Sequence, residues 1–183
     1  MEYSDTYYVR RVQNGDVAGF ACLLERYSGR VHSLIFRLTR NREDAEELAQ
    51  DVFMKAFRGL DGFKGDSSFA TWIYRIAYNA AISETRRRRV EFTAFDEALI
   101  ESFPEESMTD LTGEEGASLT ALDAALARLQ DVEQAIVLFF YMEDKSIEEI
   151  SEITKLSVAN VKVKLHRARK KLYILLTQKE EEI

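Results

Sequence analysis

Apolar residues recur at helical spacing along most of this chain, and this spacing constrains its fold more than any other feature. In the stretch 157–172, SVANVKVKLHRARKKL, they are three and four positions apart, at Val158, Val161, Leu165, Ala168 and Leu172. Such spacing places them in one stripe along an α-helix. The chain has 1 proline and 8 glycines among 183 residues, and few β-branched residues alternate with polar ones. We therefore predict an all-α fold.

The first 90 residues show the same periodicity in three successive segments. Residues 5–38 predict a buried helical face made of Phe20, Leu23, Leu24, Tyr27, Val31, Leu34, Ile35 and Leu38. Asn41 is a predicted N-cap for a second helix over 41–60, with Ala45, Leu48, Ala49, Val52, Phe53, Ala56, Phe57 and Leu60 in its core. After the glycine-rich loop GLDGFKGDSS, a third helix is expected from Ser68, with Phe69, Trp72, Ile73, Ile76, Ala77 and Ala80 turned inward.

Charge is distributed unevenly and divides the chain into three parts. Residues 1–90 hold 15 basic and 12 acidic side chains, residues 91–130 hold 1 and 10, and residues 131–183 hold 9 and 10. The stretch 91–116 has nine acids, no Lys or Arg and the single proline. We expect a domain at 1–90, an acidic linker at 91–117, in which a short docked helix over 92–103 is possible, and a second domain at 118–183. Two basic zones around an acidic middle favour a polyanionic partner for both domains.

The composition also excludes several classes of protein. A single cysteine, Cys22, allows no internal disulfide and no cysteine metal cluster. No stretch predicts a signal peptide or a membrane span, so we expect a cytoplasmic protein. The two histidines, His32 and His166, are isolated, and no phosphate-binding loop or catalytic arrangement is found. We expect no metal site, no cofactor and no enzymatic activity.

The end of the chain has the pattern of a helix-turn-helix motif. Ser146 and Glu149 have the spacing of a capping box ahead of a short helix, IEEISEIT, and Ser157 can cap a long basic helix after the connection KLS. On that helix Asn160, Lys164 and Arg167 share one face with Lys171, and such side chains suit base edges and phosphates. A solvated basic surface on an ordinary bundle helix is the alternative.

Two faces of the first domain also suggest partners. On helix 41–60 one outer face carries Glu47, Gln50, Asp51, Met54 and Arg58, which suits a basic helical partner, with a solvated face as the alternative. On the helix after Ser68, Tyr74 and Tyr78 lie one turn apart beside Arg75 and Asn79. Tyrosines next to a cation and an amide suit unstacked single-stranded bases, but packing against neighbouring helices fits Tyr74 and Tyr78 equally well.

In these motifs the chain resembles the extracytoplasmic-function (ECF) sigma factors of bacterial RNA polymerase. SIEEISEITKLSVANVKVKLHRARKKL is similar to their C-terminal DNA-binding domain, and REDAEELAQDVFMKAFRGLDGFKGDSSFATWIYRIAYNAAISETRRRR to their N-terminal core domain. The resemblance implies a σ2-like domain, a σ4-like domain and a linker that threads a channel of the polymerase. Two residues depart from the family pattern: Lys155, in the turn where many relatives have glycine, and Val163, where a polar residue is usual.

The resemblance also assigns roles to residues and names partners. Contacts with the −35 element are assigned to Ser157, Asn160, Lys162, Lys164, His166, Arg167, Arg169, Lys170 and Lys171. Contacts with the single-stranded −10 element are assigned to Phe63, Lys64, Asp66, Ser67, Arg75, Asn79, Arg86 and Arg87, with the whole run 86–89 on phosphates. Contacts with core polymerase are assigned to Glu47, Gln50, Asp51, Met54 and Arg58. The implied partners are the β′ clamp helices and β flap of core RNA polymerase, promoter DNA and an anti-sigma factor.

We therefore interpret the sequence as an alternative sigma factor that directs promoter-specific initiation by recognising −35 and −10 elements. A stand-alone helix-turn-helix regulator is the alternative within DNA-binding proteins, although it leaves the outer face of helix 41–60 and the tyrosine-containing helix after Ser68 without a purpose. A helical adaptor whose basic zones only increase solubility is the alternative of another class.

Overall fold

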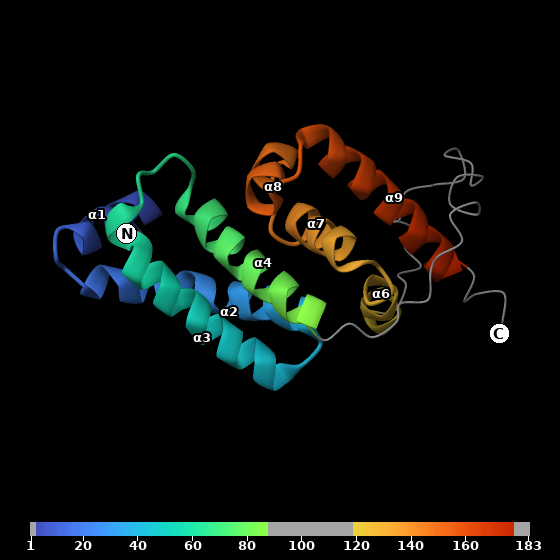
Figure 1. The fold of residues 1–183 in the computed structure, drawn as a ribbon, viewed down its shortest axis with the longest axis horizontal. Coiled ribbons are helices and arrows are strands. Elements are labelled where there is room, and N and C mark those ends of the chain that lie inside the picture. Colours follow the sequence, from blue (N-terminus) through green and yellow to red (C-terminus); the bar gives the residue numbers. More distant parts are fainter. Residues whose placement is uncertain (1–2, 88–118, 178–183) are drawn as a thin grey trace.

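The computed structural model describes residues 3–87 and 119–177, which form two groups of helices (Figure 1). The N-terminal unit contains α1 (Asp5–Gln13), α2 (Ala18–Thr39), α3 (Arg42–Gly59), the short 3-10 helix η1 (Leu60–Gly62) and α4 (Phe69–Arg87). The C-terminal unit contains α6 (Leu119–Leu126), α7 (Asp131–Tyr141), α8 (Ile147–Thr154) and α9 (Val158–Thr177). No strand occurs within these two ranges, so the all-α prediction is confirmed. The acidic linker, its possible docked helix and Arg88 and Arg89 lie outside the described residues.

In the N-terminal unit α2, α3 and α4 pack against one another, and α1 packs on α2 (Figure 1). Their shared core includes Leu23, Ile35, Val52 and Ile73, all fully buried. The predicted cap of α3 is confirmed, because the Asn41 side chain accepts a hydrogen bond from the Asp44 N–H at 3.2 Å. Periodicity and capping chemistry therefore locate these helices correctly.

Two details of the N-terminal unit differ from the prediction. The periodic segment 5–38 is interrupted between α1 and α2, where Gly15 takes φ +91°, a conformation that other residues rarely adopt. Leu24 and Phe57 were expected in the core but are 39% and 41% exposed. The apolar stripes of α2 and α3 are wider than the surfaces that the neighbouring helices cover, so these two side chains remain accessible. The Phe57 ring meets Phe20 at the edge of the bundle, with ring centroids 5.0 Å apart.

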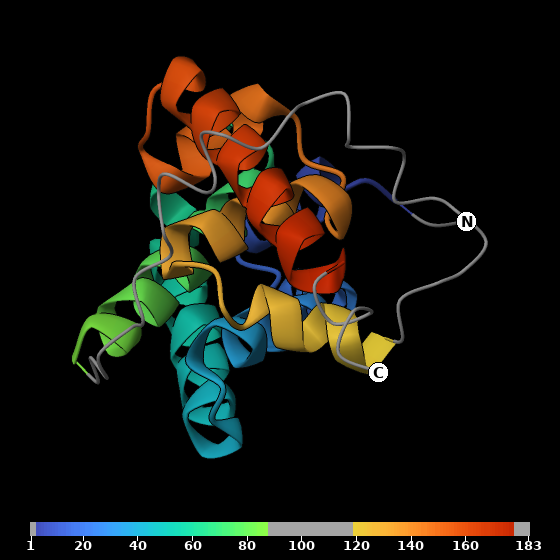
Figure 2. The ribbon, with the colours of Figure 1, turned by 90° about the vertical axis from the view of Figure 1, so that its right-hand side faces the viewer.

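In the C-terminal unit α9 lies across α6 and α7, as Figure 2 shows, and α8 packs against α7 and α9. Fully buried core residues include Leu129, Ile136, Phe139, Ile150 and Ile153. They come from the turn after α6, from α7 and from α8, and α9 adds the fully buried Val161 and Ala168, so the helix-turn-helix motif packs on a continuous core.

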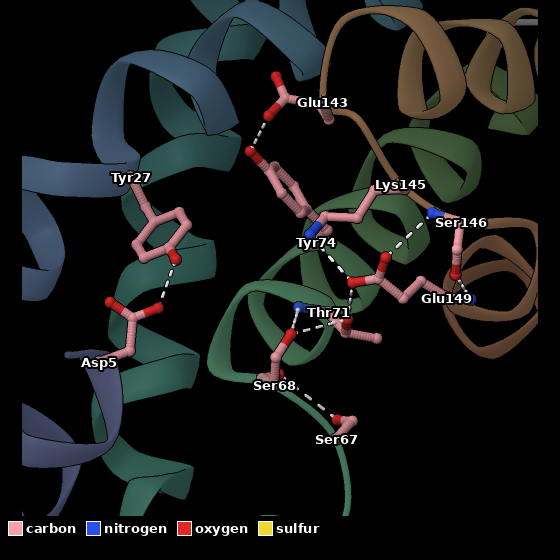
Figure 3. A network of polar contacts seen from close by, with 10 residues as sticks. All are labelled: Asp5, Tyr27, Ser67, Ser68, Thr71, Tyr74, Glu143, Lys145, Ser146 and Glu149. Carbon is pink, nitrogen blue, oxygen red and sulfur yellow. Dashed lines mark hydrogen bonds and ion pairs between the residues drawn. The ribbon is translucent and has the colours of Figure 1, made fainter.

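The two units are in direct contact, with α4 against α8 and α7 and α2 against α7 (Figure 1). At one end of the contact, Arg37 forms an ion pair with Asp123, and the Gln134 amide donates to the Arg37 carbonyl at 3.1 Å. At the other end, α4 meets α8 through the polar network of Figure 3. The structure therefore shows a closed arrangement of the two units.

Candidate nucleic-acid interface

The turn between α8 and α9 has the geometry expected of a helix-turn-helix motif. The Ser146 hydroxyl accepts from the Glu149 N–H at 3.1 Å, and the Glu149 carboxylate accepts from the Ser146 N–H at 3.0 Å, which completes the predicted capping box. The Ser157 hydroxyl accepts from the Asn160 N–H at 3.2 Å and caps α9. Lys155 adopts the left-handed conformation at φ 63°, so the turn keeps a glycine-like shape with a lysine in it.

The residues that the sequence assigns to the −35 element differ in exposure. Ser157, Asn160, Lys162 and Arg167 are exposed, whereas Lys164, His166, Arg169 and Lys170 are half-buried. Val163 lies among them and is 52% exposed. The first three turns of α9 therefore present amide, ammonium and guanidinium groups on one accessible surface, the arrangement that major-groove recognition requires.

Lys171 is not part of this surface. The structure therefore corrects the prediction from sequence that Lys171 contacts DNA. Its side chain is 8% exposed, and its ammonium donates to both carboxylate oxygens of Glu133 at 2.8 and 2.7 Å. Because Glu133 is itself 4% exposed, the pair is a buried tie between α7 and α9. A second bond joins the same two helices: Arg169 of α9 donates from Nε to the hydroxyl of Tyr141 of α7 at 2.6 Å.

The glycine-containing loop before α4 is held at both of its ends. At the first end, the Gln13 amide donates to the carbonyls of Leu60 and Phe63 at 3.0 and 2.9 Å. The half-buried Phe63 ring packs on Trp72 with centroids 5.0 Å apart. At the second end, the Ser68 hydroxyl accepts from the Thr71 N–H at 3.0 Å and so caps the first turn of α4.

Between these ends the loop presents polar groups at the surface. Lys64 and Asp66 are exposed, Ser67 is half-buried, and Gly65 takes φ +79°. On α4, Asn79, Arg86 and Arg87 are exposed and Arg75 is half-buried. The residues that the sequence assigns to the −10 element thus fall on two accessible parts of the N-terminal unit, the loop and one side of α4.

Tyr74 and Tyr78, by contrast, lie against the C-terminal unit and not at the surface. They are 1% and 6% exposed, and both rings contact Phe139 of α7, with centroids 5.7 and 6.2 Å apart. Burial, together with a hydrogen bond to Glu143, raises the pKa of Tyr74 above the ordinary tyrosine value, and burial raises that of Tyr78. In the closed arrangement these two tyrosines therefore pack between helices and are not available to unpaired bases.

Two polar bonds also join α4 to the C-terminal unit, and we call the four residues that form them, Thr71, Tyr74, Glu143 and Glu149, the domain contact (Figure 3). The Tyr74 hydroxyl donates to the Glu143 carboxylate, and the Thr71 hydroxyl donates to Glu149 at 3.2 Å. Burial alone would raise the pKa of Glu149, but hydrogen bonds from the Ser146 N–H, Lys145 and Thr71 outweigh it, so this pKa lies below its ordinary value. Glu149 therefore caps α8 and holds α4 at the same time.

The outer face of α3 is accessible in the closed arrangement. Glu47, Gln50, Asp51, Met54 and Arg58 are all exposed, and Met54 is 49% exposed. An exposed methionine among acids and an amide offers a flexible apolar contact within a mainly negative surface. Neither α7 nor α8 covers this face, since they contact the N-terminal unit through α2 and α4.

Comparison with known proteins identifies the family of the protein that carries these surfaces. The model of Sigma-70 region 2 matches residues 23–91, and that of Sigma-70, region 4 matches residues 119–172. The RNA polymerase sigma factor YlaC of Bacillus subtilis is 34% identical over 166 residues, which cover 87% of this chain and 93% of that protein. The ECF RNA polymerase sigma-E factor of Escherichia coli K12 is 33% identical over 177 residues, 92% of each chain. The chain belongs to the ECF family of RNA polymerase sigma factors.

A solved structure supports the fold of this sigma factor. The sigma factor RpoE of Bartonella quintana, in complex with the anti-sigma factor NepR, matches it with a TM-score of 0.67 at 23% identity, over 88% of this chain and 98% of that one. Because the curated relatives match both units, the sigma-factor interpretation is confirmed over a stand-alone helix-turn-helix regulator. Sigma factors are transcription initiation factors, and this one directs promoter-specific transcription.

Membrane spans and metal sites are both absent from the described residues. Within 3–87 and 119–177, no helix is long and apolar enough to cross a membrane. Over the same ranges, no three His, Cys, Asp or Glu side chains gather in a way that could hold a metal ion.

Sequence reasoning missed two residues that the structure makes prominent. Gln13 ends α1 and braces a loop 47 positions away, and nothing in its sequence neighbourhood signals that contact. Glu143 follows α7 in an acidic turn and looks like an ordinary surface acid until Tyr74 is placed beside it. Both roles depend on which helices meet in space, which local patterns do not encode.

Proposed function

We propose that this ECF sigma factor binds core RNA polymerase through the outer face of α3 and reads its promoter with two separate surfaces. The single observation that carries the proposal is that three separate accessible surfaces carry different chemical groups. The α3 face is accessible, the loop and one side of α4 present cations and an amide, and α9 presents a basic surface behind a capped turn. The proposed domain limits are 1–90 and 118–183, with the acidic linker between them.

Core polymerase binding is assigned to Glu47, Gln50, Asp51, Met54 and Arg58. Charge complementarity with a basic helical surface, such as the β′ clamp helices, would steer association, while Met54 adds an apolar contact. The C-terminal unit is proposed to meet the β flap. The exposed state of the α3 face supports this, since assembly could begin without prior separation of the units.

Recognition of the −10 element is assigned to the loop and the accessible side of α4. Unpaired bases need a pocket that the backbone can approach closely, and the loop offers Gly65 between Lys64 and Asp66. The neighbouring side of α4 offers Asn79 for base edges and Arg86 for phosphates, with Arg87 beyond it. Phe63 supports the loop from beneath through its contact with Trp72.

Recognition of the −35 element is assigned to the first turns of α9. Asn160 and Arg167 suit adenine and guanine edges in the major groove, and Lys162, Lys164 and Lys170 suit phosphates. The same surface contains Ser157, His166 and Arg169. Lys171 is left out, because its ammonium is held by Glu133 in the core.

Simultaneous contact with both elements requires the two units to separate. Positions −35 and −10 are about 25 base pairs apart, or roughly 85 Å along the duplex at ~3.4 Å per base pair. In the closed arrangement α4 and α8 touch, so the two DNA-reading surfaces cannot span that distance. Residues 88–118 would reach at most roughly 100 Å if fully extended, which is enough for separation.

The remaining parts of the proposal follow from the family. The sigma factor RpoE of Bartonella quintana is in complex with an anti-sigma factor, and we propose that this chain too has an anti-sigma partner. We also propose that it acts in the cytoplasm, where promoter DNA and polymerase are found, and that it has no enzymatic activity of its own.

Run-off transcription tests this function. Purified protein is added to bacterial core polymerase on a library of genomic fragments from its host, and the transcript starts are mapped. We expect new starts that share one sequence near −35 and another near −10. Transcription identical to that of core polymerase alone would refute the proposal.

A further inference from the structure

Gln13 is the last residue of α1, and its side chain bridges to the loop before α4. The two N–H groups of one amide donate to two carbonyls, Leu60 O at 3.0 Å and Phe63 O at 2.9 Å. Leu60 is the first residue of η1 and Phe63 follows its last, and here the chain turns out of α3 and into the loop. One side chain therefore fixes both the start and the end of that turn.

The helix that carries Gln13 is itself firmly held. Val9 and Val12 of α1 are 4% and 7% exposed, within the core of the N-terminal unit. Asp5, at the other end of α1, accepts a hydrogen bond from Tyr27 and pairs with Arg26, both on α2. The Gln13 amide thus projects from a rigid element, which a side chain must do if it is to place a loop accurately.

The loop has a different support at its far end. Ser68 caps α4 through the Thr71 N–H, and the Thr71 hydroxyl reaches Glu149 of the C-terminal unit. When the two units separate, the Thr71–Glu149 bond is lost, but the Gln13 bonds lie wholly within the N-terminal unit. In an open sigma factor the Gln13 brace remains to define the direction of the exposed residues Lys64 and Asp66.

We propose that Gln13 is a positioning residue for −10 recognition: it sets the geometry with which the loop receives an unpaired base. This inference rests on the proposed function of the loop. Its chemical requirement is for donors, because both partners are carbonyl oxygens. Gln13→Glu keeps the shape of the side chain but replaces the donors with a negative carboxylate facing two acceptors. Gln13→Lys keeps donors, at a different shape.

The experiment measures base discrimination by reconstituted holoenzyme. The probe is a non-template-strand oligonucleotide carrying the −10 element of a promoter recovered by run-off transcription, with and without a substitution in that element. We expect Gln13→Glu to lower the affinity ratio between the two oligonucleotides about tenfold, as expected for losing one to two net hydrogen bonds that hold the loop. Gln13→Lys should restore part of the ratio. Gln130→Glu, on an exposed glutamine before α7, is the matched control and should change nothing.

The outcomes distinguish a positioning role of Gln13 from a general loss of structure and from a failure of the loop assignment itself. An unchanged ratio in Gln13→Glu overturns the positioning role. A lowered ratio that follows thermal stability through both Gln13 variants, with no recovery in Gln13→Lys, also overturns it, because a general loss of structure would then be the cause. A double variant of the loop itself, Lys64→Ala with Asp66→Ala, tests the assignment beneath: if it leaves the ratio unchanged, the loop does not read the element and the proposed function of the loop fails.

Discussion

Replacing Tyr74 with phenylalanine is expected to loosen the closed arrangement of the two units without disturbing either core. The Tyr74 ring is almost fully buried and meets Phe139 edge-on, and phenylalanine keeps that contact. What is lost between the units is the hydrogen bond from the hydroxyl to the Glu143 carboxylate, one of two polar bonds that join α4 to the C-terminal unit in the domain contact (Figure 3).

The magnitude follows from the charge and exposure of the acceptor. A hydrogen bond to a charged group contributes about 1.5–3 kcal/mol net. Glu143 is half-buried, so water partly replaces the lost donor and the lower end of that range applies. A loss of about 1.5 kcal/mol changes the ratio of closed to open molecules roughly tenfold.

Resonance energy transfer between the units measures this ratio. Dyes are attached to cysteines introduced at Ser83 of α4 and Glu152 of α8, both exposed, after Cys22 is replaced by serine. Transfer is recorded against urea, so that a tenfold change in population appears as a lower midpoint for opening. We expect that midpoint to fall in Tyr74→Phe while the later unfolding of the N-terminal unit is nearly unchanged.

The structure supplies a matched control for this experiment. Tyr27 donates to the Asp5 carboxylate at 2.5 Å, the same kind of bond, but both partners lie within the N-terminal unit. Tyr27→Phe should lower the stability of that unit and leave the opening midpoint unchanged. If Tyr74→Phe leaves the midpoint at the wild-type value, or if both variants lower it equally, the reasoning that Tyr74 holds the units together is refuted.

Three other predictions concern the C-terminal unit. Lys171→Met should lower the free energy of unfolding by about 3–5 kcal/mol in a urea titration, because it leaves the buried Glu133 carboxylate without a partner, and adding Glu133→Leu should recover most of the loss. Normal stability of Lys171→Met together with a smaller salt dependence of DNA binding would contradict the buried ion pair. Arg167→Ala should cost roughly 1–3 kcal/mol of sequence-specific binding, whereas Lys170→Ala should weaken binding to all sequences alike; equal losses on specific and random duplexes from both would contradict direct readout by Arg167. The pKa of Glu149 is lowered in the folded protein chiefly by the Ser146 N–H and Lys145, which belong to its own unit, so its contribution to the stability of the C-terminal unit is present above about pH 4.3 and is lost as pH falls through the native pKa. Glu149→Gln should therefore lower the free energy of unfolding of that unit near neutral pH and differ progressively less from wild type in acid, and a difference that does not shrink in acid would contradict this role of the carboxylate.

The sequence predicts those parts of the fold whose causes are local. Asn41, Ser146 and Ser157 cap the helices expected of them, because a cap depends on residues within three positions. The break at Gly15 was not predicted, since the apolar spacing continues across it and only the turn itself reveals two helices. Local chemistry therefore locates helices better than apolar periodicity separates them.

Surface assignments depend on which helices meet, and a single helix does not contain that information. Lys170 and Lys171 are neighbours in one basic run, but Lys171 alone faces Glu133 of α7 and is buried. Tyr74 and Tyr78 likewise suit bases or packing equally well until Phe139 is placed against them. The exposed face of α3 was predictable, because its polar residues lie opposite a stripe that periodicity already defines.

The central claim is that each unit reads its own promoter element, and a double-mutant cycle between protein and DNA tests it most directly. Holoenzyme carrying Arg167→Ala or Asn79→Ala is assayed for run-off transcription on one recovered promoter and on versions with the −35 or the −10 element replaced. We expect the loss from Arg167→Ala to disappear when the −35 element is replaced and to persist when the −10 element is replaced, with the reverse for Asn79→Ala. Losses that depend on the same element for both variants, or on neither element, would contradict the account.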